Sequence, residues 1–94
     1  MPGAVRMTDL CSGHDCYERR CSSNSSEDTI TNNIQTTRFN DIRPVHSCPI
    51  GTAHSGKNVG KHNVMVNNRS IQVCGDPVDC GSTQDQGSTD VMVN

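Results

Sequence analysis

Hydrophobic residues in this chain occur in short alternating runs, and no segment has helical periodicity over three turns. Three runs alternate over three positions: Thr29-Ile30-Thr31, Val64-Met65-Val66 and Val91-Met92-Val93. The first two runs are followed by Asn-Asn, a pair that tolerates positive φ in a tight turn. Runs of this kind around such turns are typical of β-hairpins. The pattern therefore predicts an all-β chain of short hairpins.

The residues that follow the runs extend this similarity into a repeat. Residues 32–41 and 67–76 each span ten positions, begin with Asn-Asn and end in Asp. A third ending of this kind, Arg6 to Asp9, lies near the start of the chain, whereas the third run lies at its end. If the three units are equivalent, Val91–Asn94 pairs with Val5–Asp9 and closes a three-lobed ring. We therefore expect residues 1–94 to form a single pseudo-threefold domain of three short β-hairpin repeats.

The remaining segments add detail to this picture. Arg6 with Asp9, and Arg38 with Asp41, are expected to tie strand ends together by hydrogen bonds and ion pairing. The third unit has Val73 where the other two have arginine. Two further stretches are expected to be surface loops: Arg19–Asp28, which is rich in Ser and charge, and Gly81–Gly87.

Composition limits how such a chain can be stabilised. Of 94 residues only 31% are hydrophobic, with one Phe, one Tyr and no Trp. A domain of this size with so little apolar material is expected to need a metal, cross-links or a partner subunit. The net charge of −2 and the lack of a basic cluster beyond Arg19-Arg20 argue against nucleic acid as a partner. Neither a transmembrane helix nor a secretion signal is indicated.

One stretch, Pro44–His54, is the best candidate for a functional site. It contains two histidines and one cysteine within eleven residues, together with two prolines and a glycine, which is typical of a metal site on a loop. His14 and Cys80 lie in similar glycine-containing turns. Structural zinc takes four nitrogen or sulfur ligands in a closed tetrahedral shell. The sequence therefore predicts a zinc site that includes this loop.

The spacing from the three Asp residues selects the ligands. His14 lies five residues after the first Asp, His46 five after the second, and Cys80 four after the third, so each lobe supplies one ligand. His54, in the longer loop of the second lobe, is expected to be the fourth. Cys48, two residues from His46, is an alternative sulfur ligand, but convergence from separate loops favours Cys80.

The other cysteines and the fourth histidine are assigned more ordinary roles. Cys11, Cys16 and Cys21 are spaced five residues apart and could form a disulfide or hold a second metal. A reduced packing or surface role is the default for a protein made in the cytosol. No role is predicted for Cys74. His62 lies just ahead of a predicted strand and is expected to face solvent.

Several segments, taken together and in this order, resemble the PAAR-repeat proteins, which are named for a Pro-Ala-Ala-Arg segment. The matching segments are Ser12-Gly13-His14-x-Cys16, His46-Ser47-Cys48-Pro49, Val64-Met65-Val66-Asn67, residues 74–82 and residues 87–94. The chain departs from the family in lacking the Pro-Ala-Ala-Arg segment itself, in having Val73 in place of arginine, and in the polar run Thr29–Thr31.

This resemblance implies a structural rather than enzymatic function. PAAR-repeat proteins are small cones that sharpen the tip of contractile injection machines, with a zinc held near the apex by three histidines and one cysteine. The resemblance implies a monomer whose flat base docks on a trimeric β-helical spike, one copy per trimer. The expected location is the central spike of a phage tail baseplate in the virion, with transient contact with the outer membrane of the target cell. A phage tip is favoured because no toxin is fused to the chain.

Three alternatives remain open. One is the tip of a type VI secretion spike without a fused effector. Another is a secreted disulfide-rich binding module that uses all six cysteines. The third is a small zinc hydrolase, which needs an open coordination position and often a Glu base. Glu18 and Glu27 are the two glutamates of the chain, and both are far in sequence from His46 and His54.

Overall fold

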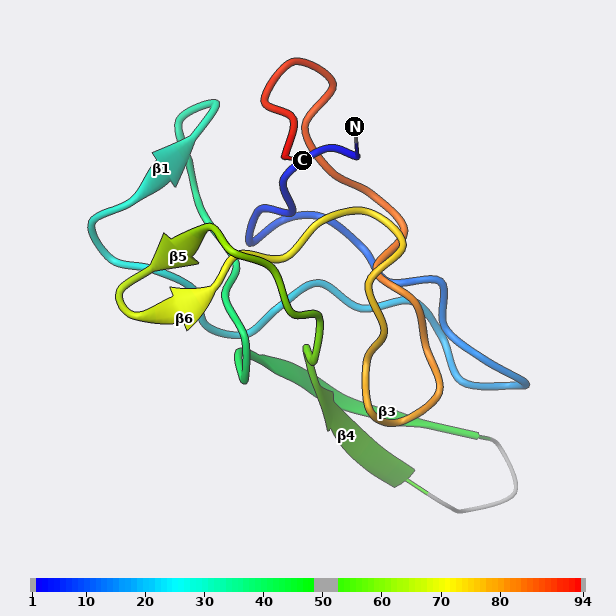
Figure 1. Cartoon of the computed structure of the whole chain (residues 1–94). Coiled ribbons are helices and arrows are strands. Elements are labelled where there is room, and N and C mark those ends of the chain that lie inside the picture. The colour runs from blue at the N-terminus through cyan, green and yellow to red at the C-terminus, as the bar shows by residue number, and fades with distance from the viewer. Residues whose placement is uncertain (1, 49–52, 94) are drawn as a thin grey trace.

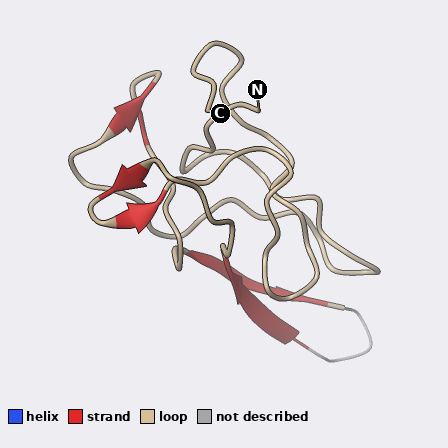
Figure 2. Cartoon of the chain, in the orientation of Figure 1, coloured by secondary structure: helices blue, strands red, loops and turns tan. Residues whose placement is uncertain are grey.

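The structure, a computed structural model, describes residues 2–48 and 53–93 and contains six short strands and no helix within those ranges. The strands are β1 (Ile30–Thr31), β2 (Ile34–Gln35), β3 (Ile42–Ser47), β4 (Ala53–Lys57), β5 (Met65–Val66) and β6 (Arg69–Ser70). They form three separate two-stranded antiparallel sheets, β1–β2, β3–β4 and β5–β6 (Figure 1). Figure 2 shows that loops and turns make up most of the described chain. The prediction of an all-β chain of short hairpins is confirmed.

Two of the hairpins turn on the predicted Asn-Asn pairs. Asn32 and Asn33 connect β1 to β2 with φ of 53° and 64°, and Asn67 and Asn68 connect β5 to β6 with φ of 54° and 63°. Positive φ at both central residues is the geometry of a type I′ turn, whose twist matches that of the flanking strands. Asn adopts this region more readily than other non-glycine residues. The turn chemistry thus sets the register of both hairpins.

The largest hairpin lies where the sequence suggested a loop. The prediction that Pro44–His54 is a loop was wrong at both ends, since β3 extends to Ser47 and β4 starts at Ala53. Residues 49–52, in the middle of the predicted loop, lie outside the described residues. Pro44 is accommodated because the pairing register shifts between Arg43 and His46, and a proline is tolerated at such an irregularity. Beyond the shift, His46 lies directly opposite His54.

The two ends of the described chain pair with each other, as predicted (Figure 1). Gly3 bridges Met92, the Ala4 N–H donates to the Val91 carbonyl at 2.9 Å, and the Val93 N–H donates to the Pro2 carbonyl at 2.9 Å. The predicted partner segment, Val5–Asp9, was wrong. Residues 6–9 of that segment form an Asp-ended turn. The residues that pair with the C-terminal run, Gly3 and Ala4, come just before this turn.

A closed ring of backbone hydrogen bonds joins three distant segments. The Val5 N–H donates to the Gln72 carbonyl at 2.9 Å, Gln72 donates to Thr37 at 3.3 Å, and Thr37 donates to Val5 at 3.0 Å. All three residues are fully buried. Each bond therefore satisfies a backbone group that has no access to water, and the ring fixes the three segments relative to one another.

Three turns with the same bonding follow the ring, at residues 6–9, 38–41 and 73–76. In each, the final Asp accepts a hydrogen bond on Oδ2 from the backbone N–H of the first residue, at 2.8, 2.6 and 2.8 Å. In the first two, the Arg6 and Arg38 guanidinium groups also donate to the Asp of their own turn. The prediction that these Arg–Asp pairs tie strand ends together is confirmed.

The interior is small and largely polar, as the composition predicted. The apolar cluster contains five residues: Ala4, Val66, Ile71, Val73 and Val93. Asn58, Gln72 and Gln84 are fully buried, and the Gln84 Nε2 donates to the Gln72 Oε1 at 2.7 Å. Buried polar groups need such partners, because each unpaired group costs about 1–3 kcal/mol. The segments Arg19–Asp28 and Gly81–Gly87 are loops, as predicted, but their buried side chains, such as Ser26 and Gln84, show that they are more than surface.

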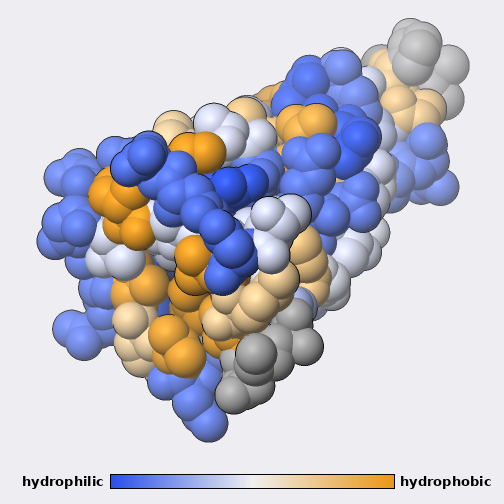
Figure 3. All heavy atoms as spheres, turned by 90° about the horizontal axis from the view of Figure 1, so that it is seen from above, coloured by the Kyte–Doolittle hydropathy of each residue, from blue (hydrophilic) through white to orange (hydrophobic). Residues whose placement is uncertain are grey.

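The molecule is elongated, with principal extents of 39 × 23 × 22 Å. Hydrophobic side chains gather at the end seen from above in Figure 3. The β3–β4 hairpin extends away from the paired chain ends (Figure 1). No helix among the described residues could cross a membrane.

Candidate metal centre

The four predicted ligands lie together. His46 on β3 and His54 on β4 face each other across the hairpin, and His14 and Cys80 come from two separate turns. One ligand atom from each residue lies within 4.8 Å of all the others. His46 is buried, and the other three side chains are half-buried. The structure therefore contains a group of three imidazoles and one thiol that could hold a metal ion.

Local backbone geometry positions the two ligands that come from turns. Gly13 and Asp15 have φ of 69° and 51° and bracket His14. This tight turn is closed by backbone hydrogen bonds between His14 and Tyr17 at 3.2 and 2.7 Å. Cys80 is followed by Gly81 at φ 109°, a conformation that glycine adopts without a steric penalty.

The imidazole nitrogens converge more closely than hydrogen bonding alone explains. His54 Nε2 lies 2.9 Å from His14 Nε2 and 2.8 Å from His46 Nε2. A ring nitrogen carries either one proton or one lone pair, so at most one of these two contacts is an ordinary hydrogen bond. In a tetrahedral shell with Zn–N bonds of about 2.0–2.1 Å, neighbouring nitrogens are about 3.3 Å apart. The rings would need to separate by only about half an ångström to take up such an ion.

A hydrogen bond on the far side of the His46 ring favours metal binding. His46 Nδ1 lies 2.8 Å from the Glu18 carbonyl oxygen. A carbonyl can only accept, so Nδ1 carries the proton and the Nε2 lone pair is free to face the other ligands. Such a bond from the ring nitrogen that does not face the metal usually fixes the orientation and tautomer of a metal-binding histidine.

The environment also keeps one ligand in its binding form. Burial lowers the pKa of His54, and the nearby His46 and His14 lower it further. A depressed pKa favours the neutral imidazole, which is the form that coordinates a metal. The charge state of this ring is thus suited to binding before any ion is added.

Tyr17, which the sequence argument overlooked, packs against all three histidines. Its ring centroid lies 4.7 Å from that of His14, 4.9 Å from that of His46 and 4.1 Å from that of His54. It is the only tyrosine in the chain and lies three residues from a predicted ligand. That position was the one sequence signal that could have identified it.

The structure corrects two expectations about the cysteines. Cys16 and Cys48 form a disulfide with a Cα–Cα distance of 5.4 Å. Cys48 is therefore not an alternative thiolate ligand, and the default of a reduced Cys16 was wrong. The spacing of Cys11, Cys16 and Cys21 did not reveal this pair, because the partner of Cys16 is 32 residues away. The thiols of Cys11, Cys21, Cys74 and Cys80 are free.

His62 does not face solvent as predicted. Its Nε2 lies 3.0 and 2.8 Å from the two carboxylate oxygens of Asp76, and its side chain is 23% exposed. No local sequence pattern indicates this contact, since Asp76 is 14 residues away. His62 therefore belongs to the third Asp-ended turn and not to the metal centre.

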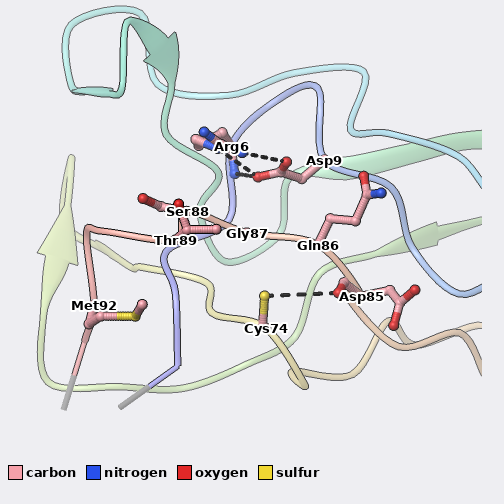
Figure 4. A pocket seen from close by; sticks show the side chains of 9 residues that line it. All are labelled: Arg6, Asp9, Cys74, Asp85, Gln86, Gly87, Ser88, Thr89 and Met92. Atoms are coloured by element: carbon pink, nitrogen blue, oxygen red, sulfur yellow. Dashed lines mark hydrogen bonds and ion pairs between the residues drawn. The ribbon is translucent and has the colours of Figure 1, made fainter.

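An open pocket of about 650 Å³ lies outside the histidine cluster, along the segment that precedes the C-terminal run (Figure 4). The Arg6 and Asp9 side chains that line it are bonded to each other, as the dashed lines in Figure 4 show. Burial raises the pKa of the Cys74 thiol, which also lines this pocket. A protonated thiol is a poor nucleophile, so this pocket has less to offer chemically than the histidine cluster.

No protein-family model matches the chain, and no curated protein sequence matches it either. The function is therefore argued from the geometry of the fold and of the histidine cluster.

Proposed function

We propose that this protein is a PAAR-like structural tip, which caps the trimeric β-helical spike of a contractile injection system, most simply a phage tail. The observation that carries the proposal is the convergence of His14, His46, His54 and Cys80 from segments that follow the same type of Asp-ended turn. One ion bound there would join three lobes at a single point. The protein's task in this proposal is to present a rigid, narrow end that helps pierce the target envelope.

Zinc is the metal that suits these donors. Three imidazole nitrogens and one thiolate form a typical structural zinc shell, whereas magnesium and calcium prefer oxygen ligands. The chain also has reason to need the ion, because its apolar cluster contains only five of the residues that the structure describes. Zinc binding in small domains is worth about 10–16 kcal/mol in apparent free energy, which is comparable to the whole stability of such a domain.

The backbone bonding supports a pseudo-threefold arrangement. The ring through Val5, Thr37 and Gln72 uses one residue from each proposed repeat, and the Asp-ended turns that follow have matching bonds. A trimeric spike ends in three equivalent strand edges, which invite incorrect pairing when left open. One chain with three similar lobes could cover all three edges, so we expect one copy per spike trimer and a monomer in isolation.

The middle residues of the three alternating runs are apolar and exposed: Ile30, Met65 and Met92 are 51%, 58% and 41% exposed. Hydrophobic side chains gather at one end of the molecule in Figure 3, and we assign these three residues to a docking surface at that end. The buried centre of a protein interface is typically rich in such residues. We assign this apolar end to the spike and the β3–β4 hairpin end to the target outer membrane, which it contacts transiently.

A non-enzymatic role is the simplest reading of the same site. A catalytic zinc keeps one position open for water, whereas here the protein offers four ligands and Tyr17 packs against three of them. The Glu18 carboxylate pairs with Arg20, so it is engaged elsewhere. The proposed location is the tail tip in the virion, and nucleic acid is not an expected partner of a chain with net charge −2.

A secreted binding module is the second candidate, and the Cys16–Cys48 disulfide favours it. A framework of six paired cysteines, however, would need the other four, which are free thiols in this structure. A tip for a type VI secretion spike would use the same surfaces as a phage tip and differs in the source of the spike.

The test combines metal analysis with stoichiometry. We expect about one zinc per purified chain. When the protein is mixed with a trimeric β-helical spike protein, we expect a complex whose native mass corresponds to one copy of this chain per three spike chains. His46→Ala and Cys80→Ser should lose the zinc, because an incomplete shell binds far more weakly. His62→Ala should keep it and serves as the control. Zinc retained by both ligand variants, or a trimer formed by this chain alone, would contradict the proposal.

A further inference from the structure

One short turn, residues 14–18, makes several distinct contacts with the histidine cluster. His14 supplies one of the four candidate ligands. Tyr17 packs its ring on all three imidazoles, and the Glu18 carbonyl accepts the hydrogen bond that orients His46. The turn therefore provides a ligand, a cover and an orienting group at once.

The same turn is covalently joined to the strand that carries another ligand. Cys16 lies two residues after His14, Cys48 lies two residues after His46, and their sulfurs form the disulfide. Cys16 is exposed, whereas Cys48 is only 6% exposed. An external thiol can therefore approach the bond from the Cys16 side.

We propose that the Cys16–Cys48 disulfide is a thiol-exchange site that controls how tightly the cluster retains its metal. The inference rests on the metal site of the proposed function and adds a regulation to it. In the oxidised protein the disulfide holds turn 14–18 against the imidazoles that would bind the ion. In the reduced protein the turn can lift away, taking His14 and the Tyr17 ring with it.

The exchange is an ordinary two-electron reaction with a small-molecule or protein thiol. An attacking thiolate forms a mixed disulfide with Cys16 Sγ, the bond between the two protein sulfurs breaks, and Cys48 leaves as a thiolate that takes up a proton. A second external thiolate attacks the mixed disulfide and releases Cys16. In total, two external thiols are oxidised to one disulfide, and the two cysteines are reduced to thiols.

The flanks of the turn are held independently of the disulfide. On one side the Ser12 N–H donates to the Thr83 carbonyl at 2.7 Å. On the other, Arg19 donates to the Cys11 carbonyl at 3.0 Å and pairs with Asp85 at 2.9 Å. Reduction should therefore loosen the turn and leave the rest of the fold in place.

The size of the effect follows from the groups that become mobile. Loss of one outer-shell partner typically costs about 10–100-fold in metal affinity. Reduction would weaken both the hold on His14 and the carbonyl contact of His46, so we expect zinc release to accelerate by about 10–100-fold.

The experiment uses the full chain loaded with zinc in its oxidised state. Release to an excess of a chromogenic chelator is followed with and without a phosphine reductant, which reduces disulfides without supplying a thiol ligand. The wild-type protein should release zinc faster after reduction. The double variant Cys16→Ser/Cys48→Ser should release it at the fast rate in both conditions. Cys74→Ser, which removes a thiol outside the cluster, should behave as wild type.

The outcomes separate this inference from the proposed function. An oxidised chain that binds no zinc overturns the metal site and the inference together. A chain that binds zinc but releases it equally fast in both redox states overturns the inference and leaves the metal site standing. Loss of the native circular dichroism spectrum on reduction also overturns it, because the disulfide would then hold the fold instead of the turn.

Discussion

A single histidine compensates for an arginine that one of the three turns lacks. Arg6 and Arg38 each reach the carboxylate of their own turn, but the Val73 side chain has no polar group and packs in the apolar cluster. His62 approaches Asp76 from another part of the chain and supplies the missing donor. The turn keeps a partner for its carboxylate, while its first residue is free to contribute to the core.

We therefore expect His62→Ala to lower the free energy of unfolding by about 1 kcal/mol, which is the net worth of a typical hydrogen bond. The Asp76 side chain is only 13% exposed, so water replaces the lost donor poorly. Urea denaturation measures the change. Asn63→Ala, an exposed neighbour, should change stability by less than about 0.5 kcal/mol. Equal effects of the two substitutions would show that the His62–Asp76 contact adds nothing.

The members of the histidine cluster could be predicted from sequence because their spacing follows a simple rule. His14, His46 and Cys80 lie four or five residues after three similar Asp-ended turns. Tyr17 and the partner of Cys16 follow no such spacing. Their positions depend on how turn 14–18 packs on β3, which is a tertiary contact without a local signal.

At the scale of elements, each described Asn-Asn turn is clasped by a loop from another part of the chain. Ser26 and Asp28 bond the Asn67 side chain at 2.6 and 2.9 Å. Ser88 and Asp90 bond Asn32 in the same way, at 2.6 and 2.8 Å. The clasping loops immediately precede hairpin runs, so each clasp links one hairpin to the next around the molecule.

These clasps predict an acid-sensitive component of stability. Hydrogen bonds from Asn67 and Ser26 lower the pKa of Asp28, and those from Asn32 and Ser88 lower the pKa of Asp90. A carboxyl with a lowered pKa adds stability above its unfolded value of about 3.9 and loses it as the pH falls through the folded value. Below about pH 4 the wild type should therefore lose more stability than Asp28→Asn/Asp90→Asn.

Urea midpoints at pH 6 and pH 3 measure this difference, and both proteins are compared without added metal. Glu27→Gln is the matched control, because Glu27 is exposed and lies between the two bonding residues of one clasp. The prediction is contradicted if Glu27→Gln reduces the loss of stability between pH 6 and pH 3 as much as the double variant does.

The hairpins show where sequence patterns are sufficient and where they are not. The two Asn-Asn hairpins could be predicted because the turn residues have a strong intrinsic preference. The β3–β4 hairpin could not, because proline at position 44 and glycine at position 56 both argue against strands. There the buried Arg43 side chain holds the strand in place, through bonds to Asn58 and to the Asp9 and Arg20 carbonyls.

For the whole molecule, the apolar end offers the sharpest test of the proposed spike contact. Met65→Asp should weaken binding to a trimeric β-helical spike protein by about 2 kcal/mol, or about 30-fold in Kd, because it places a charge at the centre of a predicted apolar interface. Surface plasmon resonance measures the affinity. Val45→Asp is the control, since Val45 is as exposed (59% against 58%) but lies on β3 next to His46 of the histidine cluster. Similar losses in both variants would argue against docking through this end.

The paired chain ends have a consequence for the connectivity of the molecule. Pro2 and Val93 are joined by a backbone hydrogen bond, so a short covalent linker between the termini would turn the polypeptide into a continuous loop. New termini could then be opened at an exposed position outside the hairpin turns, such as Asn63. Such a circular permutant should keep its network of contacts, because the ring of Val5, Thr37 and Gln72 depends on which segments meet and not on the order in which the chain visits them.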